Sequence, residues 1–427
     1  MEQVELTMKQ LIKVLVIFIM CTATQALAFG EQEFVISKDV DVHVFQQKAS
    51  GDMLLLWLPS ESGLLEQEKK TAAALARQGI EVWFADLLGA WFLSPMASSI
   101  ASLPANDVAV LIEKIRKQTG KKIILVANGR GALIVLRAAR AWQQNFGQQH
   151  RLGGVILLSP KLFVETPEPG EAGKMMPVAS KTNLPVLLLQ PANSPWRWKL
   201  DQIVSSLEQS GSDVYIRVLA ESRDRFYYRP DATKKEDAMA ARLPALLGSA
   251  VRLLQSYNTK TRQVSGKLST VRKLPGKKPR NLRKYTGDSR PSALTLYDLT
   301  DKQHSLEQYR GKVVLVNFWA SWCPPCVHEM PSMQRLKEKF KGKPFEILAV
   351  NMAENKATIM QFLKTKVQVD FTILQDSDGS ALKRWKVFAF PTSYVIGKKG
   401  KIRRALFGSI DWMNTDVVGK IDMLVNE

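Results

Sequence analysis

The chain has 427 residues, of which 45% are hydrophobic, and its formal net charge at pH 7 is +20. This length suggests two or three domains, and this composition excludes a collagenous or globally disordered protein. The sequence holds three cysteines, Cys21, Cys323 and Cys326, which are too few for a small scaffold held together by several disulfides.

Residues 1–28 have the pattern of a secretory signal peptide. An apolar stretch over residues 11–21 follows Lys9, and Ala26-Leu-Ala28 offers the small residues that a signal peptidase reads. The stretch is short for a membrane span, and an uncleaved anchor is the alternative interpretation. Cleavage after Ala28 removes Cys21 and leaves a single pair of cysteines. We therefore predict an exported, periplasmic protein.

Residues 29–257 alternate strand and helix patterns, which predicts an α/β domain with a mostly parallel sheet covered on both faces. The first two strands are expected to be antiparallel. We expect Asn106 to cap a helix that Gly120 ends. Strand-like apolar runs occur at residues 34–37, 40–45, 53–58, 82–85, 123–127, 154–158, 185–190 and 214–219. Helical patterns occur at residues 64–78, 107–118, 131–144, 199–209 and 235–257.

The strand order and the segment Ile124–Leu133 resemble the α/β-hydrolase fold. Within that segment, Ala127-Asn-Gly-Arg-Gly131 resembles the Gly-x-Ser-x-Gly turn between a strand and a helix that carries the nucleophile of that family. Gly129 takes the nucleophile's place and has no side chain that could attack a substrate. The resemblance thus implies a hydrolase-like, doubly wound sheet whose nucleophile is missing.

The other members of a hydrolase triad are also missing from the expected positions. Residues 221–226 hold no histidine, and residues 191–194 hold no acid. We predict a non-catalytic domain that binds a partner in its former substrate cleft. A plain spacer domain, or a hydrolase that uses Ser60 or Ser62, is the alternative.

Residues 258–289 are predicted to form a disordered basic linker. Ten Lys or Arg residues and no acid lie between Lys260 and Lys284, so this segment holds half of the excess charge. Such a chain repels itself and contains too few apolar residues for a core. Residues 260–284 could contact an anionic membrane surface. We expect no nucleic-acid partner, because an exported protein seldom meets a genome.

Cys323-Pro-Pro-Cys326 follows the apolar strand-like run Val313–Ala320 and opens a helical pattern. The free N–H groups and the dipole at a helix N-terminus stabilise a thiolate on Cys323. The spacing brings the two sulfurs together across one helical turn, so that the pair can exchange with disulfides. The two prolines suit the first turn, where a missing N–H costs nothing.

Residues 290–427 resemble the thioredoxin superfamily, and within it the exported TlpA/ResA-like thiol-disulfide oxidoreductases. The resemblance implies a thioredoxin-like fold for this domain. Its motifs, in family order, are Leu306–Lys312, Trp322-Cys-Pro-Pro-Cys326, Glu329-Met-Pro331, the strand at 345–351, an inserted helix at 355–367, the strand at 371–375, Asp376–Gly379, a helix near 381–387, Phe390-Pro391-Thr392, the turn Gly397–Gly400 and the strand at 402–407.

The resemblance also implies roles for individual residues. Cys323 would attack a substrate disulfide, and the more buried Cys326 would resolve the mixed disulfide. Pro391 would follow a cis peptide bond and face the cysteines. Phe390 and Trp322 would join it in contacting the substrate.

Glu329 would carry protons to and from Cys326, with a pKa raised by burial. A solvated helix residue is the alternative for this glutamate. Asn317 stands where cytoplasmic thioredoxins carry a buried acid, which makes Glu329 the more credible proton carrier. A metal site with His328 is disfavoured because Cys-x-x-Cys in a strand–helix frame is a redox motif. We expect no metal and no cofactor.

The predicted function is reduction of protein disulfides in the cell envelope, including those of apocytochromes c, with electrons from a membrane-embedded thiol donor. The resemblance alone favours reduction over oxidation. Peroxide-reducing relatives use a lone upstream cysteine that this sequence lacks. The alternative is a client-binding or chaperone module, in which the hydrolase-like cleft recruits partners and the redox activity is secondary.

Overall fold

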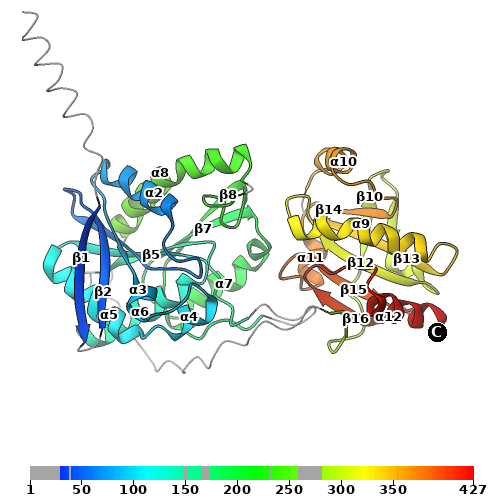
Figure 1. Cartoon of the computed structure of the whole chain (residues 1–427), viewed down its shortest axis with the longest axis horizontal. Coiled ribbons are helices and arrows are strands. Elements are labelled where there is room, and N and C mark those ends of the chain that lie inside the picture. Colours follow the sequence, from blue (N-terminus) through cyan, green and yellow to red (C-terminus); the bar gives the residue numbers. More distant parts are fainter. Residues whose placement is uncertain are drawn as a thin grey trace, which may run out of the picture. The chain divides into compact units, whose positions relative to one another are not determined.

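The computed structural model describes residues 29–427 except 38–39, 148–151, 166–172, 231, 258–280 and 353. The predicted signal peptide and most of the predicted linker lie outside the described residues. Within them the chain forms two eight-stranded sheets (Figure 1). The second of two compact units takes in Leu189–Glu236, which the sequence assigns to the N-terminal domain, so the predicted boundaries stay a prediction.

The first sheet has the strand order β1-β2-β4-β3-β5-β6-β7-β8. Strand β2 is antiparallel to β1 and β4, whereas β3 is parallel to β4 and β5, and β5 is parallel to β6. The expected antiparallel opening is thereby confirmed. The strands are β1 (Gly30–Ser37), β2 (Val40–Gln47), β3 (Met53–Trp57), β4 (Glu81–Ala85), β5 (Lys122–Asn128), β6 (Leu152–Leu158), β7 (Val186–Asn193) and β8 (Val214–Arg223).

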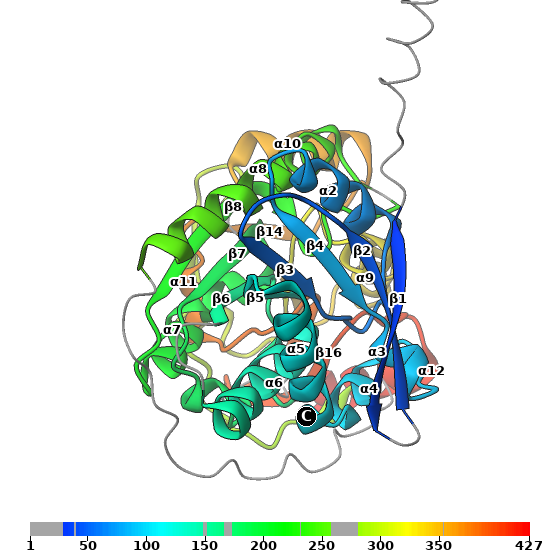
Figure 2. The same ribbon diagram turned by 90° about the vertical axis from the view of Figure 1, so that its left-hand side faces the viewer.

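Helices cover both faces of this sheet because its central strands are apolar on both sides. Strands β3, β4 and β6 are buried along their whole length. Helices α2 and α8 lie on one side of the sheet and α5 and α6 on the other (Figures 1 and 2). The helices are α2 (Glu66–Ala76), α3 (Leu87–Ala90), α4 (Ala97–Ser102), α5 (Ala105–Thr119), α6 (Gly131–Phe146), α7 (Leu200–Glu208) and α8 (Lys234–Tyr257).

The predicted cap of α5 is wrong, although its predicted end is confirmed. The helix begins at Ala105 after Pro104, so Asn106 lies inside the first turn rather than at the cap. Proline can occupy this position because its fixed φ suits the entry into a helix. Gly120 ends the helix in the left-handed conformation, with φ at 67°, and its N–H bonds to the Arg116 carbonyl.

The second sheet has the strand order β11-β10-β14-β13-β12-β15-β16-β9. Central strand β12 is fully buried, parallel to β13 and antiparallel to β15. The hairpin formed by β10 and β11 has no counterpart among the predicted strands. The strands are β9 (Arg283–Lys284), β10 (Thr295–Asp298), β11 (Gln303–Ser305), β12 (Val313–Trp319), β13 (Phe345–Met352), β14 (Thr372–Asp376), β15 (Thr392–Ile396) and β16 (Ile402–Phe407).

Helices also pack on both faces of the second sheet. Figures 1 and 2 show α9 and α12 on one face and α11 on the other. The helices are α9 (Pro324–Lys339), α10 (Lys356–Thr365), α11 (Ser380–Arg384) and α12 (Thr415–Asn426). No helix in the described part of the chain is both long enough and apolar enough to span a bilayer.

The predicted linker is wrong at its C-terminal end. Strand β9 pairs antiparallel with β16, Arg283 facing Ala405 and Lys284 facing Arg404. The preceding Leu282 is fully buried in the core. A single buried leucine and two ladder pairs are enough to order this end of the basic segment. Arg283 and Lys284 therefore belong to the sheet.

Candidate active site

Cys323 caps the N-terminus of α9, and a disulfide joins it to Cys326, with the two Cα atoms 5.3 Å apart. The side chain of Cys323 is 6% exposed, whereas that of Cys326 is fully buried. The structure thus gives the two sulfurs the predicted order of accessibility. The N–H groups of Cys326 and Val327 donate to the Cys323 carbonyl at 3.0 and 3.1 Å, which begins the helix.

Pro324 and Pro325 occupy the first turn of α9, as predicted. This is the one place in a helix where a residue without an N–H leaves no hydrogen bond unmade. The strand before them, β12, ends at Trp319, so the chain passes from the buried centre of the sheet to the helix in four residues. The cysteine pair is therefore held between two well-packed elements.

The peptide bond between Phe390 and Pro391 is cis, which confirms the predicted isomer. This bond directly precedes β15, the antiparallel neighbour of β12. The Trp322 and Phe390 rings meet edge to face, with centroids 5.9 Å apart. The structure therefore brings together two of the three predicted substrate-contacting residues.

Glu329 is buried and only 2% exposed, so the alternative of a solvated glutamate is wrong. Its Oε1 accepts a hydrogen bond from Asn317 Nδ2 at 2.9 Å. Its Oε2 accepts from the Ile410 backbone N–H and from Trp412 Nε1, both at 3.3 Å. The carboxyl group thus connects α9 to β12 and to the segment between β16 and α12.

Burial raises the pKa of Glu329 from 4.5 to about 8, against the opposing effect of its hydrogen bonds from Asn317, Ile410 and Trp412. Desolvation favours the neutral acid, and no neighbouring positive charge is present among the causes to stabilise the carboxylate against it. At neutral pH the group is mostly protonated, one helical turn after Cys326. This is the state that a proton donor needs.

Asn317 forms the other half of this polar pair. Its Nδ2 also donates to Ser393 Oγ at 2.9 Å, whereas its Oδ1 is buried and has no partner in the described part of the chain. The two ends of an asparagine amide are interchangeable by rotation. After rotation, Oδ1 can accept the proton of a neutral Glu329. Asn317 can therefore serve either protonation state of the acid.

Glu354 is a supporting residue that is not among the predicted site residues. It accepts hydrogen bonds from the Ser321 N–H at 2.7 Å, from the Ser321 hydroxyl and from Asn351 Nδ2 at 2.8 Å. These bonds fix the turn that presents Trp322 and Cys323. The only sequence signal was an acid shortly after β13. Glu354 follows Ser321 by 33 residues, and no motif connects the two positions.

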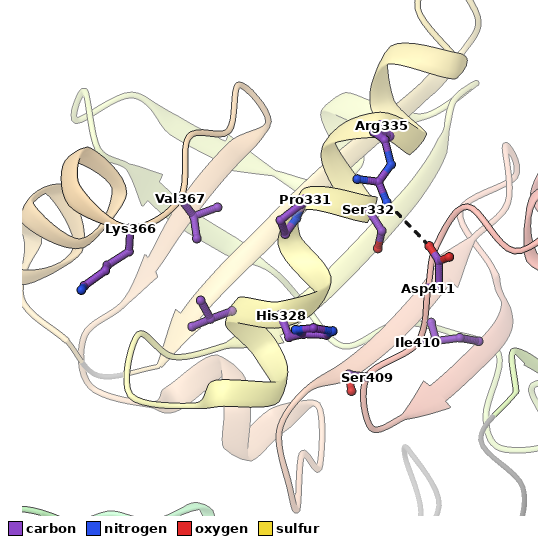
Figure 3. A pocket seen from close by; sticks show the side chains of 10 residues that line it. His328, Pro331, Ser332, Arg335, Lys366, Val367, Ser409, Ile410 and Asp411 are labelled. Carbon is purple, nitrogen blue, oxygen red and sulfur yellow. Dashed lines mark ion pairs between the residues drawn. The ribbon is translucent and has the colours of Figure 1, made fainter. Parts of the chain in front are cut away.

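His328 lies on the exposed side of α9, where it lines a groove with Pro331 and Arg335 (Figure 3). Across the described ranges, no group of three or more His, Cys, Asp or Glu residues is arranged to hold a metal ion.

Comparison with known proteins shows that the C-terminal part of this chain is similar to thiol-disulfide oxidoreductases. Residues 287–405 match the AhpC/TSA family. The thiol-disulfide oxidoreductase ResA of Geobacillus thermodenitrificans is 37% identical over 115 residues, which are 27% of this chain and 66% of that protein. ResA of Bacillus subtilis is 34% identical over 125 residues, 28% of this chain and 69% of that protein.

The matched stretch spans just under two thirds of the length of the Geobacillus relative. Among solved structures, a thiol:disulfide interchange protein of the thioredoxin family from Chlorobium tepidum aligns with a TM-score of 0.30 and 20% identity. That alignment covers 33% of this chain and 99% of the other.

Proposed function

We propose that this chain, which belongs to the ResA family of thiol-disulfide oxidoreductases, exchanges disulfides through Cys323 and Cys326. The observation that carries the proposal is the disulfide at the start of α9, with one sulfur at the helix cap and the other buried. A helix N-terminus stabilises the thiolate that must form when this disulfide is reduced. A pair in this setting can alternate between dithiol and disulfide.

The reaction begins with the reduced pair. The Cys323 thiolate attacks one sulfur of a substrate disulfide, the substrate S–S bond breaks, and the leaving sulfur takes up a proton. Cys326, now deprotonated, attacks the Cys323 sulfur and releases the second substrate thiol, which also takes up a proton. Two electrons pass from the pair to the substrate. The protein ends as the disulfide seen here.

We assign substrate contact to Trp322, Phe390 and Pro391. The edge-to-face pair of rings gives an apolar surface next to Cys323. The backbone of Phe390 lies outside the ladder of β15, which begins at Thr392, whereas the Pro391 carbonyl accepts from the Gly408 N–H at 2.8 Å. An extended substrate segment can use such a backbone edge for hydrogen bonds.

Glu329 acts as the proton carrier in this scheme. Its raised pKa leaves it protonated at neutral pH, so it can supply a proton to the first departing thiolate and, once ionised, take the proton of Cys326 before that residue attacks. Asn317 positions the carboxyl group through the 2.9 Å bond and can follow its change of charge by rotating its amide.

We further propose that the direction is reduction of envelope protein disulfides, after export by residues 1–28, with electrons from a membrane-embedded thiol donor. Residues 260–284 would add contact with anionic lipid. We expect the full chain, equilibrated with glutathione buffers and then alkylated, to give a reduction potential well below about −200 mV. A value near that of a strong oxidant, about −120 mV, would reverse the direction while keeping the exchange reaction.

For the N-terminal sheet we propose a hydrolase-like domain without acyl-transfer activity. The strand order β1-β2-β4-β3-β5-β6-β7-β8 supports this origin. Gly129 lies between β5 and α6 with φ at 54°, the strained turn at which hydrolases hold their nucleophile. A Cβ at this position would lie 2.8 Å from Glu61 Oε2, so a serine here would require the Glu61 carboxylate to move.

Glu61 also blocks the second requirement of such a hydrolase. Its Oε2 accepts a hydrogen bond from the Arg130 N–H at 2.8 Å. In the hydrolase-type turn, the N–H of the residue after the nucleophile stabilises the oxyanion. A resident carboxylate at that N–H leaves no place for a substrate oxygen. The same bond gives Glu61 a structural role as an acceptor at the N-terminus of α6.

Replacing Glu61 with alanine is expected to loosen the start of α6, because the Arg130 N–H loses its carboxylate acceptor. The loss of a helix-terminal acceptor costs about 1–2 kcal/mol. Hydrogen exchange of peptides that cover residues 128–134, measured by mass spectrometry, should therefore become roughly tenfold faster. The exposed Glu31→Ala variant is the matched control and should leave this exchange unchanged. Equal exchange in native protein and Glu61→Ala would remove Glu61 from this role.

A further inference from the structure

The end of β8 contacts the turn that carries Cys323. Leu189–Glu236 and Ser265–Glu427 lie in the same compact unit of the structure, so contacts between these two ranges are internal to that unit. Arg223, the last residue of β8, donates a hydrogen bond from Nη1 to the Trp322 carbonyl at 3.2 Å. The two residues are 99 positions apart in sequence. An arginine that precedes the basic segment thus bonds to the residue directly before the attacking cysteine.

The peptide unit between Trp322 and Cys323 is held at both ends. Its carbonyl accepts the bond from Arg223, and its N–H donates to the Ala320 carbonyl at 3.1 Å. The guanidinium is a charged donor, which makes its hydrogen bond stronger than one between neutral groups. Rotation of this peptide unit would break one or both bonds and would change the direction of the Cys323 side chain. The bond from Arg223 therefore restricts the positions that the Cys323 sulfur can occupy.

Glu236, near the start of α8, fixes the guanidinium of Arg223. Arg223 Nε and Nη2 donate to the two carboxylate oxygens at 2.8 and 2.5 Å, and the Thr233 N–H donates to Oε2 at 2.9 Å. The side chains of Arg223 and Glu236 are only 8% and 1% exposed. A buried ion pair is weak evidence for stability, because apolar residues of the same volume are often equally stabilising. The planar guanidinium can, however, pair with Glu236 through one edge while Nη1 donates to Trp322.

The same part of the chain also holds the loop that precedes the cis peptide bond. Phe388 lies three residues before Pro391 and is 4% exposed. Its ring meets the rings of Phe163 and Trp196, with centroids 5.8 and 6.4 Å apart, and Lys199 Nζ lies 3.9 Å from its centroid. All of these residues belong to one compact unit. The bond to Trp322 is therefore one of several contacts that reach the two loops of the active site.

We propose that Arg223 is a positioning residue for the disulfide exchange: it holds the peptide unit before Cys323, and with it the sulfur, in the orientation from which the bond to Cys326 forms. Arg223 acts in this role through the Trp322 carbonyl rather than on the sulfur. A sulfur held in this way closes the disulfide more readily, because its freedom is restricted before the reaction. The inference rests on the proposed exchange and adds to it a residue from outside residues 290–427.

The first test replaces Arg223 with lysine, which keeps a positive charge beside Glu236. A single ammonium group lacks the fork that bonds Glu236 and the Trp322 carbonyl together. We expect the equilibrium constant for disulfide formation by the full chain in glutathione buffers to fall about tenfold, which raises the reduction potential by about 30 mV. Arg217→Lys, at an exposed position on the same strand, is the matched control and should keep the native constant.

A second variant, Arg223→Met/Glu236→Gln, removes the hydrogen bond together with both charges. The net charge stays the same and no unpaired charge is left buried, so this variant is expected to fold even where Arg223→Lys does not. It should show the same tenfold fall in the equilibrium constant. A cooperative urea transition shows that each variant is folded before its redox equilibrium is measured.

Three results would overturn the inference. They are a native equilibrium constant in both Arg223 variants, a fall in the double variant alone, which would assign the effect to charge, and an equal fall in Arg217→Lys. In each of these cases the native chain still forms its disulfide in glutathione buffers, and the proposed exchange stands. If the cysteines of the native chain do not equilibrate with glutathione at all, the exchange itself is wrong, and the role of Arg223 is wrong with it.

Discussion

Replacing Cys323 with serine is expected to abolish disulfide exchange, with a loss of at least about three orders of magnitude in the second-order rate constant. A serine hydroxyl is not ionised at neutral pH and cannot take the place of the thiolate that attacks sulfur. The buried Cys326 cannot substitute, because its side chain has no exposed surface. Single-turnover reduction of hydroxyethyl disulfide by the pre-reduced variant measures the loss.

Cys326→Ser is the informative partner variant. It keeps the attacking sulfur of Cys323 and removes the sulfur that resolves the mixed disulfide. We expect one substrate molecule to stay bound to Cys323, visible as a mass increase that dithiothreitol reverses. If the mass increase appeared instead in Cys323→Ser, the order of attack would be opposite to the one proposed here.

The strands around the cysteine pair could be predicted from the sequence because each is a continuous apolar run between clear breakers. The fully buried β12 and the two prolines after Cys323 are local signals of this kind. The strand Ile402–Phe407 was predicted at its observed bounds for the same reason, since a turn at Gly397–Gly400 precedes it. In these places local pattern and tertiary packing favour the same conformation.

The errors lie where distant residues decide the structure. Arg283 and Lys284 have the composition of a linker, yet β16 provides a free edge with which they pair. Asn106 has a better intrinsic preference for a helix cap than Pro104, but the helix begins at Ala105, two residues before its predicted start. Strands β10 and β11 have only four and three residues, too few for a periodic pattern.

The same distinction applies to the site. Cys323, Cys326 and Pro391 stand in motifs that their neighbours in sequence define, so these residues could be predicted. Glu354 acts on Ser321 across 33 residues of sequence, and no local pattern connects the two. The burial of Glu329 on α9 depends on contacts with Asn317 and Trp412, which come from two other parts of the domain. Sequence could suggest that glutamate, but only the packed structure excludes its exposure to solvent.

Glu329→Gln is expected to make the stability of the domain less dependent on pH. Burial raises the pKa of Glu329 to about 8 in the folded state, from 4.5 as its ordinary value. Between these values the unfolded chain is ionised at this residue and binds one proton fewer. The free energy of unfolding of the native protein therefore falls by about 1.4 kcal/mol per pH unit as pH rises. The stabilising contribution of protonated Glu329 to this free energy is complete below pH 4.5 and is lost as pH rises through 8.

Glutamine is neutral at every pH, so the variant lacks this slope. At pH 4.5 the two proteins should have similar stability, provided that the Asn317 amide rotates to accept from the glutamine NH₂. At pH 8.5 the variant should be the more stable by several kcal/mol, up to roughly 5 kcal/mol on full ionisation. Urea denaturation at both pH values measures the difference. The exposed Glu338→Gln on the same helix is the control and should follow the native protein.

The catalytic effect of Glu329→Gln is expected in the opposite direction. Without an acid that exchanges protons near neutral pH, the exchange rate should fall by roughly 10²-fold, the usual contribution of a positioned proton carrier. The native pH–rate profile should bend near pH 8, where Glu329 ionises, and the variant profile should lack this bend. A merely structural glutamate would predict no such change in the profile. A variant that gains stability at pH 8.5 yet keeps the native rate and the bend would show that Glu329 is buried for packing and carries no proton.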